Sequence, residues 1–259
     1  MTKLGIIVFD IDGVLRDVSK SYRRAIIDTV DYLTNNAYIP IMEDIDKLKS
    51  EGIWNNDWKV SQELTYRFFE TQGKTRDEIN LNYEEIIKFF QSRYFGKDKA
   101  NFNGYIKTEP LLVNKNYFDL LDKNSFGWGF FSGATRNSVE YILKERIGLE
   151  NPLMIAMEDA PEKPDPKGLF MVVNKIDSNH QIPVIYVGDT VADMYTVKKA
   201  HEEVDNSRLW IGVGILPPHV LEDKKRKENY TDTLKKAGAS IVLDNVQKLT
   251  PTLIKELIK

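Results

Sequence analysis

The stretch LGIIVFDIDGVL, residues 4–15, is the segment from which the fold can be argued. Its first six residues, Leu4–Phe9, are apolar and rich in β-branched side chains, and Asp10, Asp12 and Gly13 follow them closely. A short continuous apolar run of this kind predicts a strand that is buried on both faces, as in a parallel sheet covered by helices. The two aspartates then stand at the carboxyl end of that strand, which is where open parallel sheets bind their ligands.

Five further apolar runs repeat this arrangement along the chain. Each is followed by glycine, aspartate or serine and then by a helical pattern, which is typical of an α/β protein. We therefore expect a doubly wound, mainly parallel, Rossmann-like core. The expected later strands are Phe126–Phe131, Leu153–Met157, Val184–Val187, Leu209–Val213 and Ile241–Leu243, with intervening helices at Asn137–Ile147, Lys167–Ile176 and Val191–Ala200.

The pattern changes after the first strand. Over residues 19–105 apolar side chains recur at three- and four-residue spacing, for example at Tyr83 and Ile86, and no convincing strand interrupts them. A connection of this length is not an ordinary loop. We therefore expect an inserted α-helical cap over 19–105, within a core formed by 1–18 and 106–259.

The composition excludes several classes of protein. The 42% of hydrophobic residues is ample for a core, and a net charge of −3 argues against binding nucleic acid or membranes through bulk charge. The absence of cysteine excludes disulfides, cysteine-ligated metals and thiol catalysis. Because no apolar run is long enough for a signal peptide or a membrane span, we expect a cytoplasmic monomer or homodimer without nucleic-acid or membrane partners.

Acidic and hydroxyl groups follow three of the expected strands. Asp10 and Asp12 follow the first strand, Ser132 the second, and Asp189 and Asp193 a later one. Residues two apart on an extended segment, or four apart on a helix, can project to the same side. Four carboxylates packed together repel one another unless a cation or a proton intervenes. Since all are oxygen ligands and no cysteine or histidine cluster accompanies them, the pattern predicts Mg²⁺.

The segment Lys163-Pro164-Asp165-Pro166 supplies a cation on a stiff backbone. Proline fixes its own φ angle and keeps the preceding residue out of a helix. A lysine held in this way can neutralise a phosphoryl group and stabilise the charge of a neighbouring carboxylate.

In this order, Asp10-x-Asp12-Gly13, Ser132, Lys163-Pro164 and Gly188-Asp189-Thr190-x-x-Asp193 resemble the motifs of the haloacid dehalogenase superfamily. The helical insertion resembles that of its C1-capped subfamily, which includes phosphoglycolate phosphatases and β-phosphoglucomutase. The resemblance implies an aspartyl-phosphate mechanism, whose expected residues follow. Asp10 would be the nucleophile, Asp12 would act as acid and then base, and the phosphate site would be formed by Ser132, Gly133 and Lys163. The Mg²⁺ site would be formed by Asp10, the carbonyl of Asp12, Asp189 and Asp193. Asp193 would ligate the ion directly, ligate it through water, or orient Lys163.

The function that this resemblance implies is hydrolysis of a small phosphate monoester, either phosphoglycolate-like or a sugar phosphate. Asp12 favours a phosphatase, because the dehalogenases and phosphonoacetaldehyde hydrolases of the superfamily lack an acid at this position. One alternative is a phosphomutase, which would need cationic groups on the cap; Arg23, Arg24, Lys59 and Arg67 are available. The other is a non-catalytic phosphometabolite-binding protein, which would not need a nucleophile beside an acid.

Several residues have two readings from the sequence. Asn55, Asn56 and Trp58 are candidates for contact with the substrate, or they serve the structure of the cap. Arg16 and Arg136 lie just beyond the first and second motifs and are either contacts for an anionic substrate or ion-pair residues.

Overall fold

The structure is a computed structural model, and it divides into two compact units, Met1–Asp17 with Pro110–Lys259, and Val18–Glu109. The residues that it describes are 3–98, 102–179, 181–204 and 208–259. Among them, no helix combines the length and the apolar character needed to cross a membrane.

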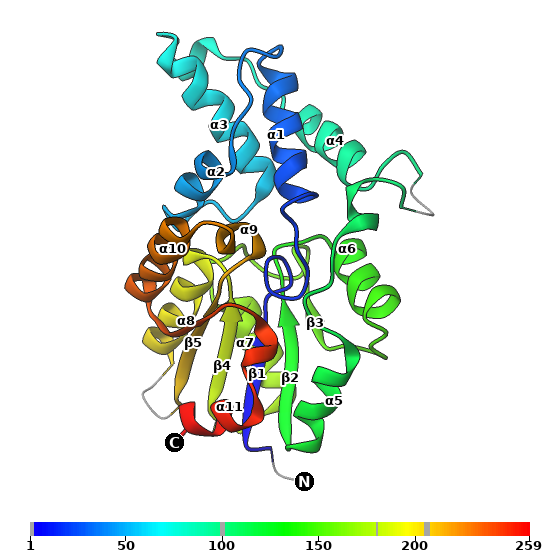
Figure 1. The fold of residues 1–259 in the computed structure, drawn as a ribbon, viewed down its shortest axis with the longest axis vertical. Helices are drawn as coiled ribbons and strands as arrows, with labels where there is room; N and C mark the ends of the chain where they lie inside the picture. Colours follow the sequence, from blue (N-terminus) through cyan, green and yellow to red (C-terminus); the bar gives the residue numbers. More distant parts are fainter. Residues whose placement is uncertain (1–2, 99–101, 180, 205–207) are drawn as a thin grey trace. The chain divides into compact units, whose positions relative to one another are not determined.

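The first unit contains a six-stranded sheet in the order β3-β2-β1-β4-β5-β6, and every neighbouring pair is parallel (Figure 1). This confirms the doubly wound fold expected from the sequence. Because the strand order reverses between β1 and β4, the site at their carboxyl ends lies at a topological switch point. The strands are β1 Gly5–Phe9, β2 Phe126–Phe131, β3 Met154–Ile155, β4 Val184–Gly188, β5 Trp210–Ile215 and β6 Ala239–Leu243.

Helices cover both faces of this sheet (Figure 1). On one face, α7 (Lys167–Ile176) and α8 (Val191–Glu203) pack against alternate strand residues such as Ile6 and Val8. On the other face, Phe9 of β1 contacts aromatic rings of α5 (Lys115–Lys123) edge to face. β1 is therefore buried on both sides, which explains its continuous apolar sequence. The other elements of this unit are α6 Arg136–Glu140, η3 Tyr141–Arg146, α9 Pro218–Leu221, α10 Lys224–Ala237, η4 Val246–Lys248 and α11 Pro251–Leu257.

Two of the expected elements differ from the structure in more than their ends, whereas the others agree or differ by one to three residues at an end. The strand predicted over Leu153–Met157 is wrong in length: only Met154 and Ile155 pair with β2, because the amide of Ala156 donates instead to the Asp159 carboxylate at 2.8 Å. The single helix predicted over Asn137–Ile147 is a short α-helix, α6, continued by a π-helical segment, η3.

The second unit is helical, and no strand occurs in its described residues. Its α1 packs against α3 and α4, with the rings of Tyr22 and Tyr94 stacked at a centroid distance of 3.9 Å. Its elements are α1 Tyr22–Leu33, α2 Met42–Lys49, α3 Asp57–Thr71, η1 Arg76–Glu78, α4 Tyr83–Tyr94 and η2 Tyr105–Thr108.

Candidate active site

The loop that follows β1 packs next to the carboxyl end of β4. The amide of Asp10 donates to the Val187 carbonyl at 2.8 Å, which continues the pairing of β1 with β4. Gly13 then adopts a φ of +76°, in the left-handed region that glycine occupies without steric penalty. A Cβ atom on Gly13 would lie 2.1 Å from Oδ2 of Asp189. Glycine is therefore required at this position if Asp189 is to approach the loop.

Lys163 joins two carboxylates beyond the strand ends. Its Nζ lies 2.9 Å from Oδ1 of Asp10 and 2.7 Å from Oδ1 of Asp193, and all three side chains are buried. Removing the charge of Lys163 would leave two buried carboxylates without a cation, which is costly. The three residues thus form one electrostatic unit drawn from separate parts of the chain.

Asp193 is held by four protein donors. Its Oδ1 accepts hydrogen bonds from Lys163 at 2.7 Å and from the hydroxyl of Tyr186 at 3.0 Å, and its Oδ2 accepts from the amide and hydroxyl of Thr190 at 3.0 and 2.6 Å. The Thr190 contacts form the capping box that begins α8. Sequence reasoning missed Tyr186, for which the only signal is a tyrosine inside an otherwise aliphatic strand.

The protonation equilibria follow from this arrangement. Burial raises the pKa of Asp10 from 3.8 to about 7; Lys163 opposes this increase, whereas Asp193 and Asp12 add to it. Burial alone would lower the pKa of Lys163, but the charges of Asp10 and Asp193 outweigh burial and raise it. For Asp193, Lys163 and Thr190 outweigh burial and lower the pKa.

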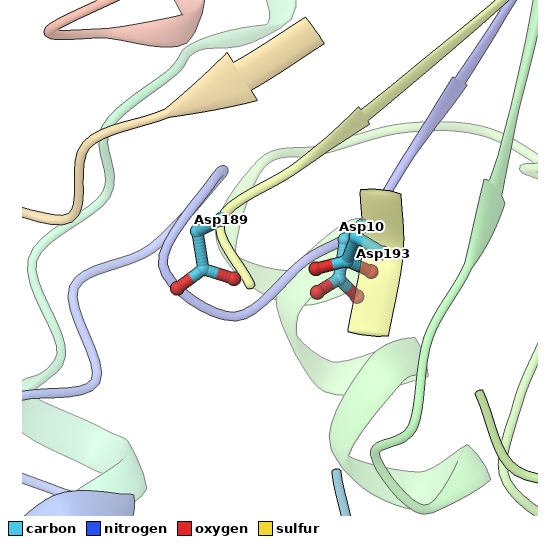
Figure 2. Close-up of side chains that lie close together, drawn as sticks. All are labelled: Asp10, Asp189 and Asp193. Atoms are coloured by element: carbon cyan, nitrogen blue, oxygen red, sulfur yellow. The ribbon is translucent and has the colours of Figure 1, made fainter. Parts of the chain in front are cut away.

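The carboxylates of Asp10, Asp189 and Asp193 fit a hard cation. One oxygen from each lies within 4.8 Å of the others, and all three residues are buried (Figure 2). Lys163 supplies one positive charge against these three carboxyl groups, so a divalent ion would balance the surplus. Because both oxygens of Asp193 already accept two hydrogen bonds each, Asp10 and Asp189 are the better candidates for direct ligands.

Ser132 directly follows β2, at the carboxyl end of the sheet where the other site residues lie. Its amide donates to the Ile155 carbonyl at 3.0 Å, and its Oγ accepts the amide of Ala134 at 3.1 Å. This turn fixes the Ser132 hydroxyl and the Gly133 backbone at the strand end. The phosphate-binding role of Ser132 and Gly133 stays a prediction.

The two arginines beyond the motifs both form ion pairs. Arg16 pairs with Asp12 at 2.5 Å, and Arg136 contacts the carboxylate of Asp159 while its amide donates to Glu158 at 2.9 Å. Both therefore have the ion-pair role that the sequence left open. The assignment of Arg136 to the phosphate site stays a prediction.

The model of the family described as haloacid dehalogenase-like hydrolase matches residues 4–201, which include every motif that forms this site. The chain belongs to that family.

Three proteins similar to this haloacid dehalogenase-like hydrolase illustrate its relationships. A curated protein named imidazoleglycerol-phosphate dehydratase, from Phytophthora nicotianae, is 28% identical over 245 residues, which cover 92% of this chain and 49% of that protein. The chain thus spans about half the length of this relative. The structure of phosphatase Tt82 from Thermococcus thioreducens has a TM-score of 0.58 and 25% identity, covering 80% of this chain and 92% of that one. A phosphonoacetaldehyde hydrolase like protein from Oleispira antarctica has a TM-score of 0.68, covers 98% of this chain and 92% of that one, and at 15% identity supports the fold alone.

One of the candidate substrate contacts in the hydrolase's helical unit, Asn56, has a local structural role. Asn56 is the N-cap of α3, and its Oδ1 accepts hydrogen bonds from the amides of Trp58 and Lys59 at 3.0 and 3.2 Å. The next residue, Asp57, pairs with Lys49 at 2.7 Å. The assignment of Asn55, Asn56 and Trp58 to substrate binding stays a prediction.

Proposed function

We propose that this enzyme is a Mg²⁺-dependent phosphatase that hydrolyses a small phosphate monoester through an aspartyl phosphate on Asp10. The observation that carries the proposal is the buried unit of Asp10, Lys163 and Asp193 at the sheet's switch point. This unit supports the proposal because the Asp10 carboxylate, which can act as a nucleophile, lies beside a fixed cation that can neutralise a phosphoryl oxygen. Bound to Asp10, Asp189 and the carbonyl of Asp12, Mg²⁺ would neutralise charge on the phosphoryl group.

In the first half of the proposed reaction, a carboxylate oxygen of Asp10 attacks phosphorus. The bond to the ester oxygen breaks, and its electron pair stays on that oxygen, which takes a proton from the carboxyl group of Asp12. Lys163 and the Ser132 hydroxyl hold the phosphoryl oxygens while charge spreads over them. The alcohol leaves and Asp10 carries the phosphoryl group.

In the second half, a water oxygen attacks the same phosphorus atom. The Asp12 carboxylate, ionised by the first step, accepts a proton from that water. The bond between phosphorus and Asp10 breaks, so the nucleophile is restored and inorganic phosphate is released. Asp12 returns to its protonated form, which closes the cycle.

The substrate class proposed is a small carboxylate-bearing or sugar phosphate. The name of the Phytophthora nicotianae relative adds imidazole-bearing phosphate esters such as imidazoleglycerol phosphate to the compounds that merit a test. A phosphomutase is less favoured, because two of the four cap cations that it would need are in ion pairs within the helical unit. Arg23 pairs with Asp46, and Arg67 pairs with Glu51 and Glu63.

The deciding experiment is a phosphate-release screen of a metabolite panel, with and without Mg²⁺. We expect release for at least one ester, dependence on Mg²⁺, and loss of activity in the Asp10→Asn variant. Interconversion of sugar phosphates without phosphate release would instead indicate a mutase. Tight binding of a phosphate compound without turnover would indicate a binding protein.

A further inference from the structure

Arg16 is a fully buried cation beside the proposed acid. Its side chain has 0% exposure, whereas that of Asp12 has 24%. Nε and Nη2 of Arg16 lie 2.6 and 2.5 Å from one oxygen, Oδ1 of Asp12, and Nη2 also donates to Oγ of Ser138 at 3.0 Å. Burying a guanidinium group is costly unless its donors are paired in this way. A role as a solvated surface charge is therefore excluded for Arg16.

The backbone fixes the position from which Arg16 reaches Asp12. The amide of Gly13 donates to the Arg16 carbonyl at 3.0 Å, which closes the loop between the two side chains. Arg16 also forms an antiparallel bridge with Leu111, on the segment that returns from the helical unit. The guanidinium group is therefore set by backbone pairing at both Gly13 and Leu111, not by a mobile side chain alone.

The contact between the guanidinium group of Arg16 and Oδ1 distinguishes the two carboxylate oxygens of Asp12. A carboxylate oxygen has two lone-pair sites, and two N–H groups of Arg16 occupy those of Oδ1. We therefore expect Asp12 to exchange its proton through Oδ2. The contact with Ser138, in α6, ties this orientation to the helix that follows the Ser132 turn.

We propose that Arg16 is a positioning residue that holds the Asp12 carboxyl group so that Oδ2 faces the ester oxygen and, later, the attacking water. The inference rests on the proposed phosphatase function. Arg16 exchanges no proton; it orients the group that does. Its contribution should therefore depend on how much the leaving oxygen needs a proton.

Two esters of similar shape differ in how strongly departure of the leaving group depends on protonation. p-Nitrophenolate departs readily without protonation, whereas phenolate is a poorer leaving group, so phenyl phosphate depends more on Asp12. The value of kcat/KM reports steps up to the first irreversible one, which here includes transfer of the phosphoryl group to Asp10. In Arg16→Gln we expect kcat/KM for phenyl phosphate to fall about 10- to 100-fold, and that for p-nitrophenyl phosphate to fall less than about threefold.

Matched variants separate positioning from general damage to the fold. Asp12→Asn should show the same selective loss in larger measure, and Ser138→Ala, which frees the far end of the guanidinium group, should show it in smaller measure. Arg208 is another buried arginine, paired with Asp177 away from the site. Arg208→Gln should lower the thermal midpoint without changing the ratio of the two kcat/KM values.

The outcomes are distinguishable. A selective loss with phenyl phosphate in Arg16→Gln, partly restored in Arg16→Lys, supports the positioning role. Equal losses with both esters, or no loss with either, overturn it while leaving the phosphatase function intact. If the wild-type enzyme hydrolyses no phosphate ester in the presence of Mg²⁺, the proposed function fails and this inference fails with it.

Discussion

The hydroxyl of Tyr186 donates to Oδ1 of Asp193 at 3.0 Å, the same oxygen that accepts a hydrogen bond from Lys163 at 2.7 Å. Tyr186 is fully buried in β4, and burial together with the nearby carboxylates raises its pKa well above 10, so its hydroxyl remains a donor. Tyr186, which sequence reasoning did not single out, therefore holds Asp193, the partner of Lys163, in place.

Tyr186→Phe should impair catalysis more than binding. Without the hydroxyl, Asp193 and Lys163 gain freedom, and we expect kcat to fall about three- to tenfold with little change in KM, because misplacement of a charged group chiefly affects the transition state. Stability should fall by about 1 kcal/mol, as for one hydrogen bond. Steady-state kinetics and urea unfolding measure the two effects.

Tyr117→Phe is the control for Tyr186→Phe. The Tyr117 hydroxyl is also buried, and it donates to the Leu249 carbonyl at 3.0 Å rather than to a group of the site. It should lose similar stability with unchanged kcat. Equal changes in kcat for the two variants would show that Tyr186 acts through stability alone.

Gly13→Ala should weaken Mg²⁺ binding. The added methyl group would displace the carboxylate of Asp189, from whose Oδ2 it would lie only 2.1 Å. We expect the Mg²⁺ concentration needed for half-maximal activity, and for half-maximal thermal stabilisation, to increase at least about tenfold. Titration of both properties with Mg²⁺ makes the measurement.

Gly148→Ala is the matched control, because Gly148 has a φ of +81° and the methyl group of an alanine there would meet no described atom within 4 Å. Backbone strain should cost both variants about 1 kcal/mol of stability. Only Gly13→Ala should alter the Mg²⁺ titration. An unchanged titration in Gly13→Ala would remove Asp189 from the metal site.

Asp10→Asn should stabilise the metal-free protein at neutral and higher pH. Because folding raises the pKa of Asp10 from 3.8 to about 7, the folded state binds more protons than the unfolded state between these values. The free energy of unfolding therefore falls as pH rises through this window, and the loss is complete above it. Asparagine removes the effect.

Thermal unfolding in EDTA and in Mg²⁺, at pH 4 to 9, tests this prediction. In EDTA, the midpoint of Asp10→Asn should exceed that of the wild type by a few degrees above pH 7 and approach it near pH 4. Mg²⁺ should stabilise the wild type but not the variant. If the metal-free wild type is at least as stable as the variant at pH 8, the raised pKa of Asp10 is contradicted.

Asp177→Asn should destabilise the core away from the site. Asp177 accepts the amides of Asn179, Gln181 and Ile182 and pairs with the buried Arg208. Burial opposes the charged form of Asp177, but these donors outweigh it and lower the pKa. We expect a loss of about 2–4 kcal/mol near pH 7.

The loss in Asp177→Asn should shrink as pH falls through the lowered pKa of Asp177, since the wild type then loses the same charge. Denaturant unfolding between pH 2 and 7 measures this convergence. The half-exposed Asp244, paired with Lys227 and Lys248, is the control: Asp244→Asn should cost less than about 1 kcal/mol. Comparable losses in the two variants would refute the distinction.

The sheet and its polar strand ends could be read from the sequence because they depend on local patterns. β2 and α7 have the predicted bounds, since a continuous apolar run and an amphipathic repeat each define an element without reference to neighbours. β3 could not be read in the same way: as an edge strand it has one partner, and its end is set by a side-chain contact with Asp159.

The sequence by itself determined which residue types stand at the ends of the strands and on the stiff segment between them: Asp10, Ser132 and Asp189 follow apolar runs, and Lys163 precedes a proline. Only the tertiary structure decided which side chains of the site pair with one another. Asp193 is joined to Lys163, Arg16 to Asp12, and Tyr186 to Asp193. Such pairings depend on which side chains meet when distant segments fold together, and no periodicity of a single segment encodes that meeting.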